Sequence, residues 1–381
     1  MTMKFLIVAS FPESLLGFRG ALLESLKSKG IDVHVAAPDL PAGSALRAKI
    51  EMCGYCVHNI KLQRVGMNPL RDLISIIELW RLMTSLKPDA VLAYTVKPVV
   101  YGLLAARLAS VPKRFALITG LGYAFQGAES TWGSRNWLRL IVQRLYALAL
   151  RGANKTFFQN PDDQKLFFER ALLRPSAESV VVNGSGVDLK VYEQSVPPTP
   201  ISFLLIARLL GDKGIREYVE AARLIKKLHP AVRFNLVGWI DDNPDSISSA
   251  ELNSWVTEGL VTYWGRLSDV RPAIESSSVY VLPSYREGTP RTVLEAMAMG
   301  RAIITTDAPG CRETVIDGLN GYLVEVKNAE SLAFAMMRFV SEPNIVYAMG
   351  QESRRLAEEK FDVHAVNNKM LREMQISKYI G

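Results

Sequence analysis

The sequence predicts an α/β protein of two doubly wound domains, each a parallel sheet covered by helices on both faces. Its 381 residues are about twice the usual size of one domain. Short apolar runs alternate with amphipathic stretches along nearly the whole chain. A proline-rich stretch without periodicity, 188–200, interrupts this pattern and is typical of a linker. The predicted domains are therefore residues 1–187 and 201–362, followed by a helical segment, 363–381, that could pack back on either domain, the first included.

Each predicted strand is a short apolar run, and the runs form two series. The first series is 5–9, 33–37, 90–94, 114–118, 155–159 and 179–182, and the second is 203–207, 233–237, 261–264, 279–283, 302–306 and 321–324. A further strand is predicted separately at 55–60. Parallel sheets place ligand loops beyond the carboxyl ends of their strands. Two such domains facing each other across a cleft suit an enzyme that moves a group from a donor on one domain to an acceptor on the other.

The composition is that of an ordinary globular protein, with 49% hydrophobic and 22% charged residues. No apolar run reaches the roughly 18 to 20 residues of a membrane span, and residues 3–10 are too short for a signal peptide, so we expect a cytoplasmic protein. Residues 1–190 hold 24 basic and 14 acidic side chains, whereas the remainder holds 21 and 24. An anionic membrane or a phosphorylated acceptor suits this basic half; nucleic acid is disfavoured because no binding motif accompanies the charge.

Three cysteines, Cys53, Cys56 and Cys311, fit a reducing compartment. The first two have the spacing of a redox or zinc motif. A redox thiol should open a helix after a strand, but here a predicted helix ends near 52, Gly54 caps it and a strand follows. A zinc site would need a second cysteine pair or nearby histidines. The sequence therefore favours a structural role for this motif.

The densest functional signal is the stretch 283–300. A predicted strand ends at Pro283, a loop carries Glu287 and Gly288, and Thr289 and Pro290 are predicted as the N-cap and first residue of a helix. The free amides and positive dipole end of a helix bind phosphate well, and a glycine lets the backbone approach a ligand closely. We expect a phosphate site at this helix start.

Glu295 lies on the same predicted helix among apolar residues, where a carboxylate needs donors. From Thr289 to Glu295 the helix rises roughly 9 Å, comparable with the length of a diphosphate. Glu287 could then meet hydroxyls of a sugar and Glu295 those of a ribose. The alternative is that Glu287 caps locally and Glu295 pairs with a lysine.

A second constellation is 204–214, where a strand end delivers Arg208 and a turn delivers Lys213. Two cations there suit a diphosphate leaving group, whose developing charge they would stabilise. The alternative is solvated surface charge, but the loop of Glu287 is predicted at the same sheet edge.

These motifs resemble those of glycosyltransferase family 4. The matching residues are Arg208 and Lys213, then Glu287 with seven residues before Glu295, and then the stretches 306–313, 317–318 and 320–324. The resemblance covers most of residues 4–360. It implies the GT-B fold, two Rossmann-like domains facing across a cleft, and a retaining enzyme in which Arg208 and Lys213 hold the donor diphosphate, Glu287 the transferred sugar and Glu295 the ribose.

The resemblance also implies further contacts. On the donor side these are Gly17 near the phosphates, Gly265 and Leu267 beside the base, and the backbone of Gly288, Thr289 and Pro290. On the acceptor side Arg19, Lys97, Thr119, Gly120 and Gly122 look like the loops of bacterial enzymes that add N-acetylhexosamines to undecaprenyl-diphosphate glycans. Many relatives place a histidine in the loop of Gly120, and this chain has none there.

Retention without a second carboxylate nucleophile implies front-face displacement, as proposed for the family, with a UDP-sugar as substrate and no cofactor or metal. The acidic run 241–245 is interpreted as a polar turn rather than a metal site. The expected acceptor is a lipid-diphosphate-linked glycan of surface polysaccharide, O-antigen or glycoprotein glycan synthesis, at the inner face of the bacterial inner membrane.

The stretch 132–151 carries Arg135, Arg139, Arg144 and Arg151 among aromatic and aliphatic residues. It suits a helix lying on an anionic bilayer and equally a covering helix of the first domain. Two other functions share the architecture, a UDP-N-acetylglucosamine epimerase-like enzyme and a two-lobed sugar-binding protein. A nicotinamide enzyme is disfavoured because the glycine fingerprint is missing from residues 9–17.

Overall fold

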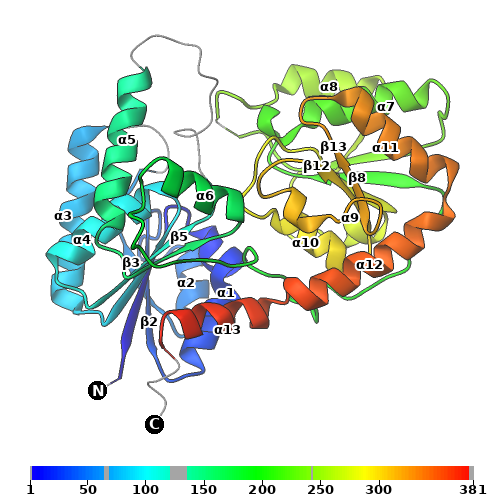
Figure 1. Ribbon diagram of the computed structural model, residues 1–381. Helices are drawn as coiled ribbons and strands as arrows, with labels where there is room; N and C mark the ends of the chain where they lie inside the picture. The colour runs from blue at the N-terminus through cyan, green and yellow to red at the C-terminus, as the bar shows by residue number, and fades with distance from the viewer. Residues whose placement is uncertain (1, 64–67, 121–134, 242, 377–381) are drawn as a thin grey trace. The chain divides into compact units, whose positions relative to one another are not determined.

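The computed structural model describes residues 2–63, 68–120, 135–241 and 243–376. The chain divides into two compact units (Figure 1). The first unit is residues 1–185 together with 367–381, and the second is residues 186–366. Each is a parallel sheet with helices on both faces, so the predicted α/β class is confirmed. Among the helices within these described ranges, none is long and apolar enough to cross a bilayer.

The sheet of the first unit has seven parallel strands in the order β3-β2-β1-β4-β5-β6-β7. Its strand order reverses between β1 and β4, so a ligand crevice is expected beyond the carboxyl ends of these two strands. The predicted runs match the observed strands to within one or two residues. The strands are β1 (Lys4–Val8), β2 (Asp32–Ala37), β3 (Cys56–Asn59), β4 (Ala90–Tyr94), β5 (Lys113–Ile118), β6 (Lys155–Phe158) and β7 (Ser179–Val181).

Two apolar clusters fill the two faces of this sheet because alternate strand residues point to opposite sides. Phe5 and Ile7 of β1 belong to one cluster, and Leu6 and Val8 to the other. The first face is covered by α1 (Glu13–Lys27), α2 (Ala45–Met52) and α13 (Val363–Glu373). The second is covered by α3 (Pro69–Leu86), η1 (Pro98–Gly102), α4 (Leu103–Leu108), α5 (Arg135–Leu150) and α6 (Pro161–Glu169). Burial on both faces explains why the strands are continuous apolar runs.

The end of the chain belongs to the first unit. Met370, Leu371 and Met374 are buried in its core. Two lysines add polar contacts: Lys155 Nζ lies 2.7 Å from Glu373 Oε2, and Lys369 Nζ donates to the Val181 carbonyl at 2.8 Å. The C-terminal segment thus completes a sheet face made by the first half of the sequence.

The sheet of the second unit has six parallel strands in the order β10-β9-β8-β11-β12-β13, with the reversal between β8 and β11. Helices α7, α8 and α11 lie on one side and α9, α10 and α12 on the other (Figure 1). The strands are β8 (Ser202–Ile206), β9 (Arg233–Val237), β10 (Thr262–Tyr263), β11 (Val279–Leu282), β12 (Ala302–Thr306) and β13 (Gly321–Val324). The helices are η2 (Gly211–Lys213), α7 (Ile215–Lys226), α8 (Ser249–Thr257), α9 (Arg271–Glu275), α10 (Arg291–Ala298), η3 (Arg312–Thr314), α11 (Ala329–Ser341) and α12 (Asn344–Lys360).

Arg301, a fully buried cation, ties the stretch 188–200 to the second unit. Its guanidinium donates to the carbonyls of Ser195, Met299 and Ile274, with distances of 2.7 to 3.0 Å. Burial lowers its pKa to about 10, so the group is still charged at neutral pH. Carbonyl oxygens therefore replace the water around this charge and fasten the proline-rich stretch to the sheet.

We predict that Met370→Ala destabilises the protein by about 2 to 4 kcal/mol, because the deletion leaves a cavity in a fully packed face. Urea unfolding would measure the change. The control is Asn368→Ala, an exposed position on the same helix, which should shift stability by less than about 0.5 kcal/mol. Equal effects of the two substitutions would contradict the assigned packing of α13.

Candidate active site at the carboxyl ends of strands β8 and β11

Both constellations found in the sequence lie at the point where the strand order of the second unit reverses. β8 ends at Ile206 and leads through Arg208 to η2 (Gly211–Lys213), and β11 ends at Leu282 and leads through a loop to α10. In open parallel sheets this reversal is the place where ligands bind. The fold therefore brings the two cations and the Glu287 loop to one edge.

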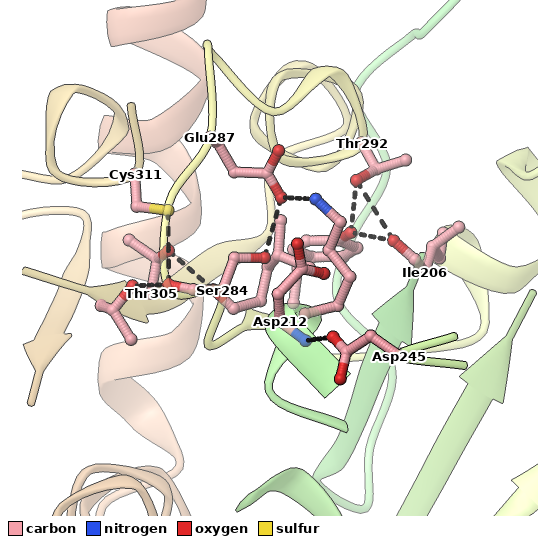
Figure 2. A network of polar contacts seen from close by, with 12 residues as sticks. Ile206, Asp212, Asp245, Ser284, Glu287, Thr292, Thr305 and Cys311 are labelled. Atoms are coloured by element: carbon pink, nitrogen blue, oxygen red, sulfur yellow. Dashed lines mark hydrogen bonds and ion pairs between the residues drawn. The ribbon is translucent and has the colours of Figure 1, made fainter. Parts of the chain in front are cut away.

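An ion pair joins the two loops. Lys213 Nζ lies 2.6 Å from Glu287 Oε1, and the Ser284 hydroxyl donates to the same oxygen at 2.8 Å; dashed lines from Glu287 mark both contacts in Figure 2. Both charged side chains are mostly buried. Burial alone would lower the pKa of Lys213, but the carboxylates of Glu287 and Asp212 outweigh it and raise that pKa. The ammonium is therefore charged at neutral pH.

Two glycines allow the close approach of these loops. Gly214 has φ +70°, and a Cβ there would lie 2.1 Å from the Pro283 carbonyl oxygen. Gly310 has φ +81°, and its Cβ would lie 2.0 Å from the Glu287 carbonyl oxygen. The Glu287 amide also donates to the Pro309 carbonyl at 2.9 Å. Any side chain at either glycine would push the Glu287 loop away.

The buried Cys311 and two threonines hydrogen-bond to carbonyls of this loop and of the strand before it; Figure 2 labels Cys311 and Thr305. Cys311 Sγ donates to the Ser284 carbonyl at 3.8 Å, and Thr306 donates to the same oxygen. Thr305 donates to the Leu282 carbonyl at 2.8 Å. Burial raises the pKa of the Cys311 thiol to about 12, so it remains a neutral packing group.

Asp241 and Asp245 of the acidic run lie at the same edge. Asp241 Oδ2 lies 3.1 Å from Arg208 Nη1, and Asp245 Oδ2 accepts the Asp212 amide at 2.9 Å (Figure 2). The Asn243 side chain accepts the Asp245 amide at 3.0 Å, as in a polar turn. Arg208 and Lys213 are thus each matched by a carboxylate from another loop.

Asp212 was not singled out by the sequence, although it precedes Lys213. Within the described parts of the chain its Oδ1 is buried without a hydrogen-bond partner. Burial raises the pKa of Asp212, and the charges of Glu287 and Asp245 raise it further against the opposing effect of Lys213. The Asp212 carboxyl therefore lies close to Lys213, the cation that the sequence predicts to bind phosphate.

The start of α10 differs from its prediction. Pro290, with φ −73° and ψ 112°, is the N-cap and the helix begins at Arg291, so the assignment of Thr289 as N-cap was wrong. The Thr292 hydroxyl lies 2.7 Å from the Tyr280 hydroxyl and donates to the Ile206 carbonyl at 3.3 Å. This anchor to β8 and β11 fixes the first turn. Gly288, Thr289 and Pro290 are all buried.

Glu295 lies in the second turn of α10 and is 5% exposed. Its Oε1 accepts from the Tyr192 hydroxyl and from Arg291 Nε, both at 2.8 Å. Burial raises the pKa of Glu295, while Arg291 and Tyr192 act to lower it. The donors that a buried carboxylate needs therefore come from an arginine one turn earlier and from a tyrosine of the stretch 188–200, which the sequence did not identify.

Gly265 and Leu267 follow β10 at the same sheet edge. The Gly265 carbonyl accepts the Gly238 amide at 3.0 Å, so it lies directly beyond the end of β9. Nearby, the Arg266 guanidinium stacks on the Trp239 ring, with Cζ 4.6 Å from the ring centre. An aromatic surface thus lies beside the loop that was assigned to the base.

In the first unit, Thr119 and Gly120 follow β5, and Gly122 lies outside the described residues. Lys97 follows β4, and its Nζ lies 3.1 Å from Asp72 Oδ1 with both side chains largely buried. Lys97, which the sequence predicts to contact the acceptor, therefore forms an ion pair with Asp72 of α3.

Gly17 and Arg19 lie within α1 rather than in the loop before it. Gly17 is exposed on the helix, whereas Arg19 is 3% exposed and its guanidinium lies 5.2 Å from the centre of the Tyr94 ring. The Tyr94 hydroxyl in turn lies 2.7 Å from Ser14 Oγ. Arg19 is thus packed at the ends of β1 and β4 rather than displayed on the surface.

Two protein-family models match the chain in succession. The model described as glycosyl transferase 4-like matches residues 13–160, and the model described as glycosyl transferases group 1 matches residues 200–342. The first region contains Arg19, Lys97 and Thr119, and the second contains the ion pair described above.

Curated relatives are similar over most of their length. The N,N'-diacetylbacillosaminyl-diphospho-undecaprenol alpha-1,3-N-acetylgalactosaminyltransferase of Campylobacter jejuni is 32% identical over 337 residues, which is 84% of this chain and 85% of that protein. The UDP-Gal:alpha-D-GlcNAc-diphosphoundecaprenol alpha-1,3-galactosyltransferase of Escherichia coli is 25% identical over 77% of each chain.

Solved structures share the fold. Sucrose-phosphate synthase from Thermosynechococcus elongatus gives a TM-score of 0.80 at 18% identity, with both chains fully covered. HepE from Anabaena, solved in complex with UDP, gives 0.76 at 19% identity over 98% of this chain and all of that one. By the extent of its similarity to the Campylobacter enzyme and by its fold, the chain belongs to the group 1, family 4-like glycosyltransferases with the GT-B fold.

Proposed function

We propose that this chain is a retaining, metal-independent glycosyltransferase that moves a sugar, an N-acetylhexosamine, from a UDP donor to an undecaprenyl-diphosphate-linked glycan during synthesis of a bacterial surface glycan. The observation that carries the proposal is the Lys213–Glu287 ion pair at the reversal between β8 and β11. The names of the Campylobacter and Escherichia relatives support the acceptor class, and the Campylobacter name supports the sugar class.

In this proposal the two cations stabilise the departing diphosphate. An ammonium group has three donors, and one N–H of Lys213 is directed to Glu287 at 2.6 Å. The other two could turn to phosphate oxygens without leaving the carboxylate. The Arg208 side chain, about one third exposed, adds a planar guanidinium group that can donate two hydrogen bonds to the same diphosphate. The site is largely shielded from water, where fixed charges stabilise a developing anion most strongly.

Glu287 then has a positioning and sugar-binding role. Its Oε1 is already shared by Lys213 and Ser284, which argues against a freely attacking nucleophile. Without such a nucleophile, retention follows from attack on the same face that the diphosphate leaves. The donor phosphate would accept the acceptor's proton, and Lys213 and Arg208 would supply the positive charge that a divalent metal supplies elsewhere.

The test is a transfer assay with a panel of UDP-sugars and a prenyl-diphosphate-linked acceptor. We expect UDP release with a UDP-N-acetylhexosamine, a product linkage with the donor's anomeric configuration by NMR, and unchanged turnover in EDTA. An inverted linkage would refute retention, and activity that EDTA abolishes and Mg²⁺ or Mn²⁺ restores would refute metal independence. Hydrolysis or epimerisation without transfer would refute the proposed function.

We predict that Lys213→Ala lowers kcat by about 10² to 10³-fold, as removal of a charge-stabilising donor does elsewhere, and that Glu287→Gln lowers it at least tenfold. Steady-state UDP release would measure both. Lys227→Ala, an exposed lysine of the same unit, and Glu258→Gln, a glutamate paired with Arg223 at the surface, serve as controls. Site variants as active as these controls would show that the assignment is wrong.

We also propose that the first unit rests on an anionic bilayer, at the cytoplasmic face of the inner membrane where such acceptors are presented. The supporting feature is an apolar stripe on α3 made of Leu70, Leu73, Ile74 and Ile77, all exposed. These positions recur every three to four residues, so they share one helix face. The opposite face of the same helix buries Leu79 and Met83 in the core.

Exposed basic residues lie on the same helix and on or just after α5. Arg71 and Arg81 are exposed on α3, and Arg144 and Arg151 are exposed on or just after α5. Leu140, Ile141 and Leu148 of α5 are also exposed, and both helices pack on η1. The predicted membrane stretch 132–151 lies partly outside the described residues. An apolar face flanked by arginines is the pattern of an interfacial helix.

We predict that Leu70→Glu combined with Leu73→Glu weakens binding to phosphatidylglycerol-containing vesicles at least tenfold in cosedimentation, since the variant places two anions on the membrane face. Raising salt should weaken wild-type binding because the arginines contribute through a screened attraction. Phe334→Glu, an equally exposed apolar residue of the second unit, is the control. Absence of wild-type binding at low salt would contradict the proposal.

A further inference from the structure

Three metal-ligating side chains meet on strands β2 and β3 of the first unit. Within the described residues, Asp32, His34 and Cys56 each offer a ligand atom, and these atoms all lie within 4.8 Å of one another. The strand register explains the meeting. His34 lies opposite Cys56, and Asp32 precedes His34 by two residues, so all three side chains share one face of the sheet. Neither the transfer site nor the predicted acceptor loops use them.

His34 supplies an independent indication of a ligand. The residue is 6% exposed, and within the described chain its Nε2 is buried without a hydrogen-bond partner. Asp32 Oδ2 lies 3.1 Å from that nitrogen but does not satisfy hydrogen-bond geometry. The His34 ring nitrogen is buried while the Asp32 side chain is 39% exposed, and a cation placed between the nitrogen and the carboxylate oxygen would satisfy both atoms.

His58 holds the ring of His34 in place. His34 Nδ1 lies 3.0 Å from His58 Nε2, and the two rings stack with centroids 5.2 Å apart. When Nδ1–H donates to His58, the lone pair of His34 is on Nε2, directed to Asp32. Metal-binding histidines are typically held by such a second hydrogen bond from the other ring nitrogen.

The competing interpretation is a simple ion pair between a protonated His34 and Asp32. It accounts for the 3.1 Å separation, but not for the missing hydrogen bond or for the thiol beside the pair. One carboxylate oxygen, one imidazole nitrogen and one thiolate sulfur are a typical donor set for zinc. Tetrahedral zinc at usual bond lengths separates its ligand atoms by roughly 3.3 to 3.6 Å, so small side-chain rotations would complete the site.

We propose that Asp32, His34 and Cys56 bind one Zn²⁺ ion, with water as the fourth ligand. Binding would release the thiol proton of Cys56 to the buffer. β3 is the edge strand of its sheet, and the ligands lie at or near the amino ends of β2 and β3, away from the loops that follow the strands. The ion would therefore clamp the edge strand to β2 and take no part in transfer. Cys53 is not in the group, so the partners of Cys56 come from the neighbouring strand rather than from the Cys53–Cys56 motif.

The test is zinc titration of the full-length chain after treatment with EDTA and its removal, in competition with a chromophoric chelator. We expect one Zn²⁺ per chain in the wild type. Cys56→Ser and Asp32→Asn should each weaken binding at least tenfold, and His58→Ala about 10- to 100-fold. Cys53→Ser, the matched control with an exposed thiol three residues away, should bind as the wild type does.

Cobalt substitution identifies the ligand independently of affinity. The wild type and Cys53→Ser should show thiolate-to-cobalt charge-transfer absorption, and Cys56→Ser should lack it. The proposal is overturned if the wild type binds no zinc, if Cys56→Ser binds as tightly as the wild type, or if Cys53→Ser and Cys56→Ser lose binding equally. The last result would mean adventitious binding by surface thiols only.

Discussion

The ion pair between Lys213 and Glu287 is the constraint on which the arrangement of the second unit's ligand edge depends. Each charge is mostly removed from water, which is costly for one alone and tolerable only when the partner is in place. The pair therefore fixes the turn after β8 against the loop after β11. That loop leads directly into α10, so the positions of Pro290, Arg291 and Glu295 follow from the same contact.

The central strands could be predicted because they are buried on both faces and appear as continuous apolar runs, whereas the edge strands β3, β7 and β10 are partly exposed. The edge that carries the site could also be predicted, since parallel strands deliver their loops to one side. Side-chain partners could not. Asp241 pairs with Arg208 from a loop 33 residues away, and Tyr192 reaches Glu295 across 103 residues. The N-cap of α10 was predicted at Thr289 rather than Pro290. Thr292 in the first turn is hydrogen-bonded to Tyr280 and Ile206, and such tertiary contacts override local capping preferences.

Composition gave an incomplete view of the basic first half. Lys97 is paired with Asp72, and the side chain of Arg19 in α1 packs against Tyr94, so neither contributes an open positive charge. The sequence directed attention to 132–151, whereas the exposed apolar stripe lies on α3. That stripe was invisible in the sequence because α3 is apolar on two faces, and periodicity alone does not show which face meets the core.

Gly214 and Gly310 limit how this edge can change. Because these residues have no Cβ, the chain passes so close to the carbonyls of Pro283 and Glu287 that no side chain fits between them. A residue larger than glycine at either position could not be accommodated unless the two backbones moved apart. New properties at this edge would instead arise from replaced side chains on the fixed loops, while the backbone beneath stays the same.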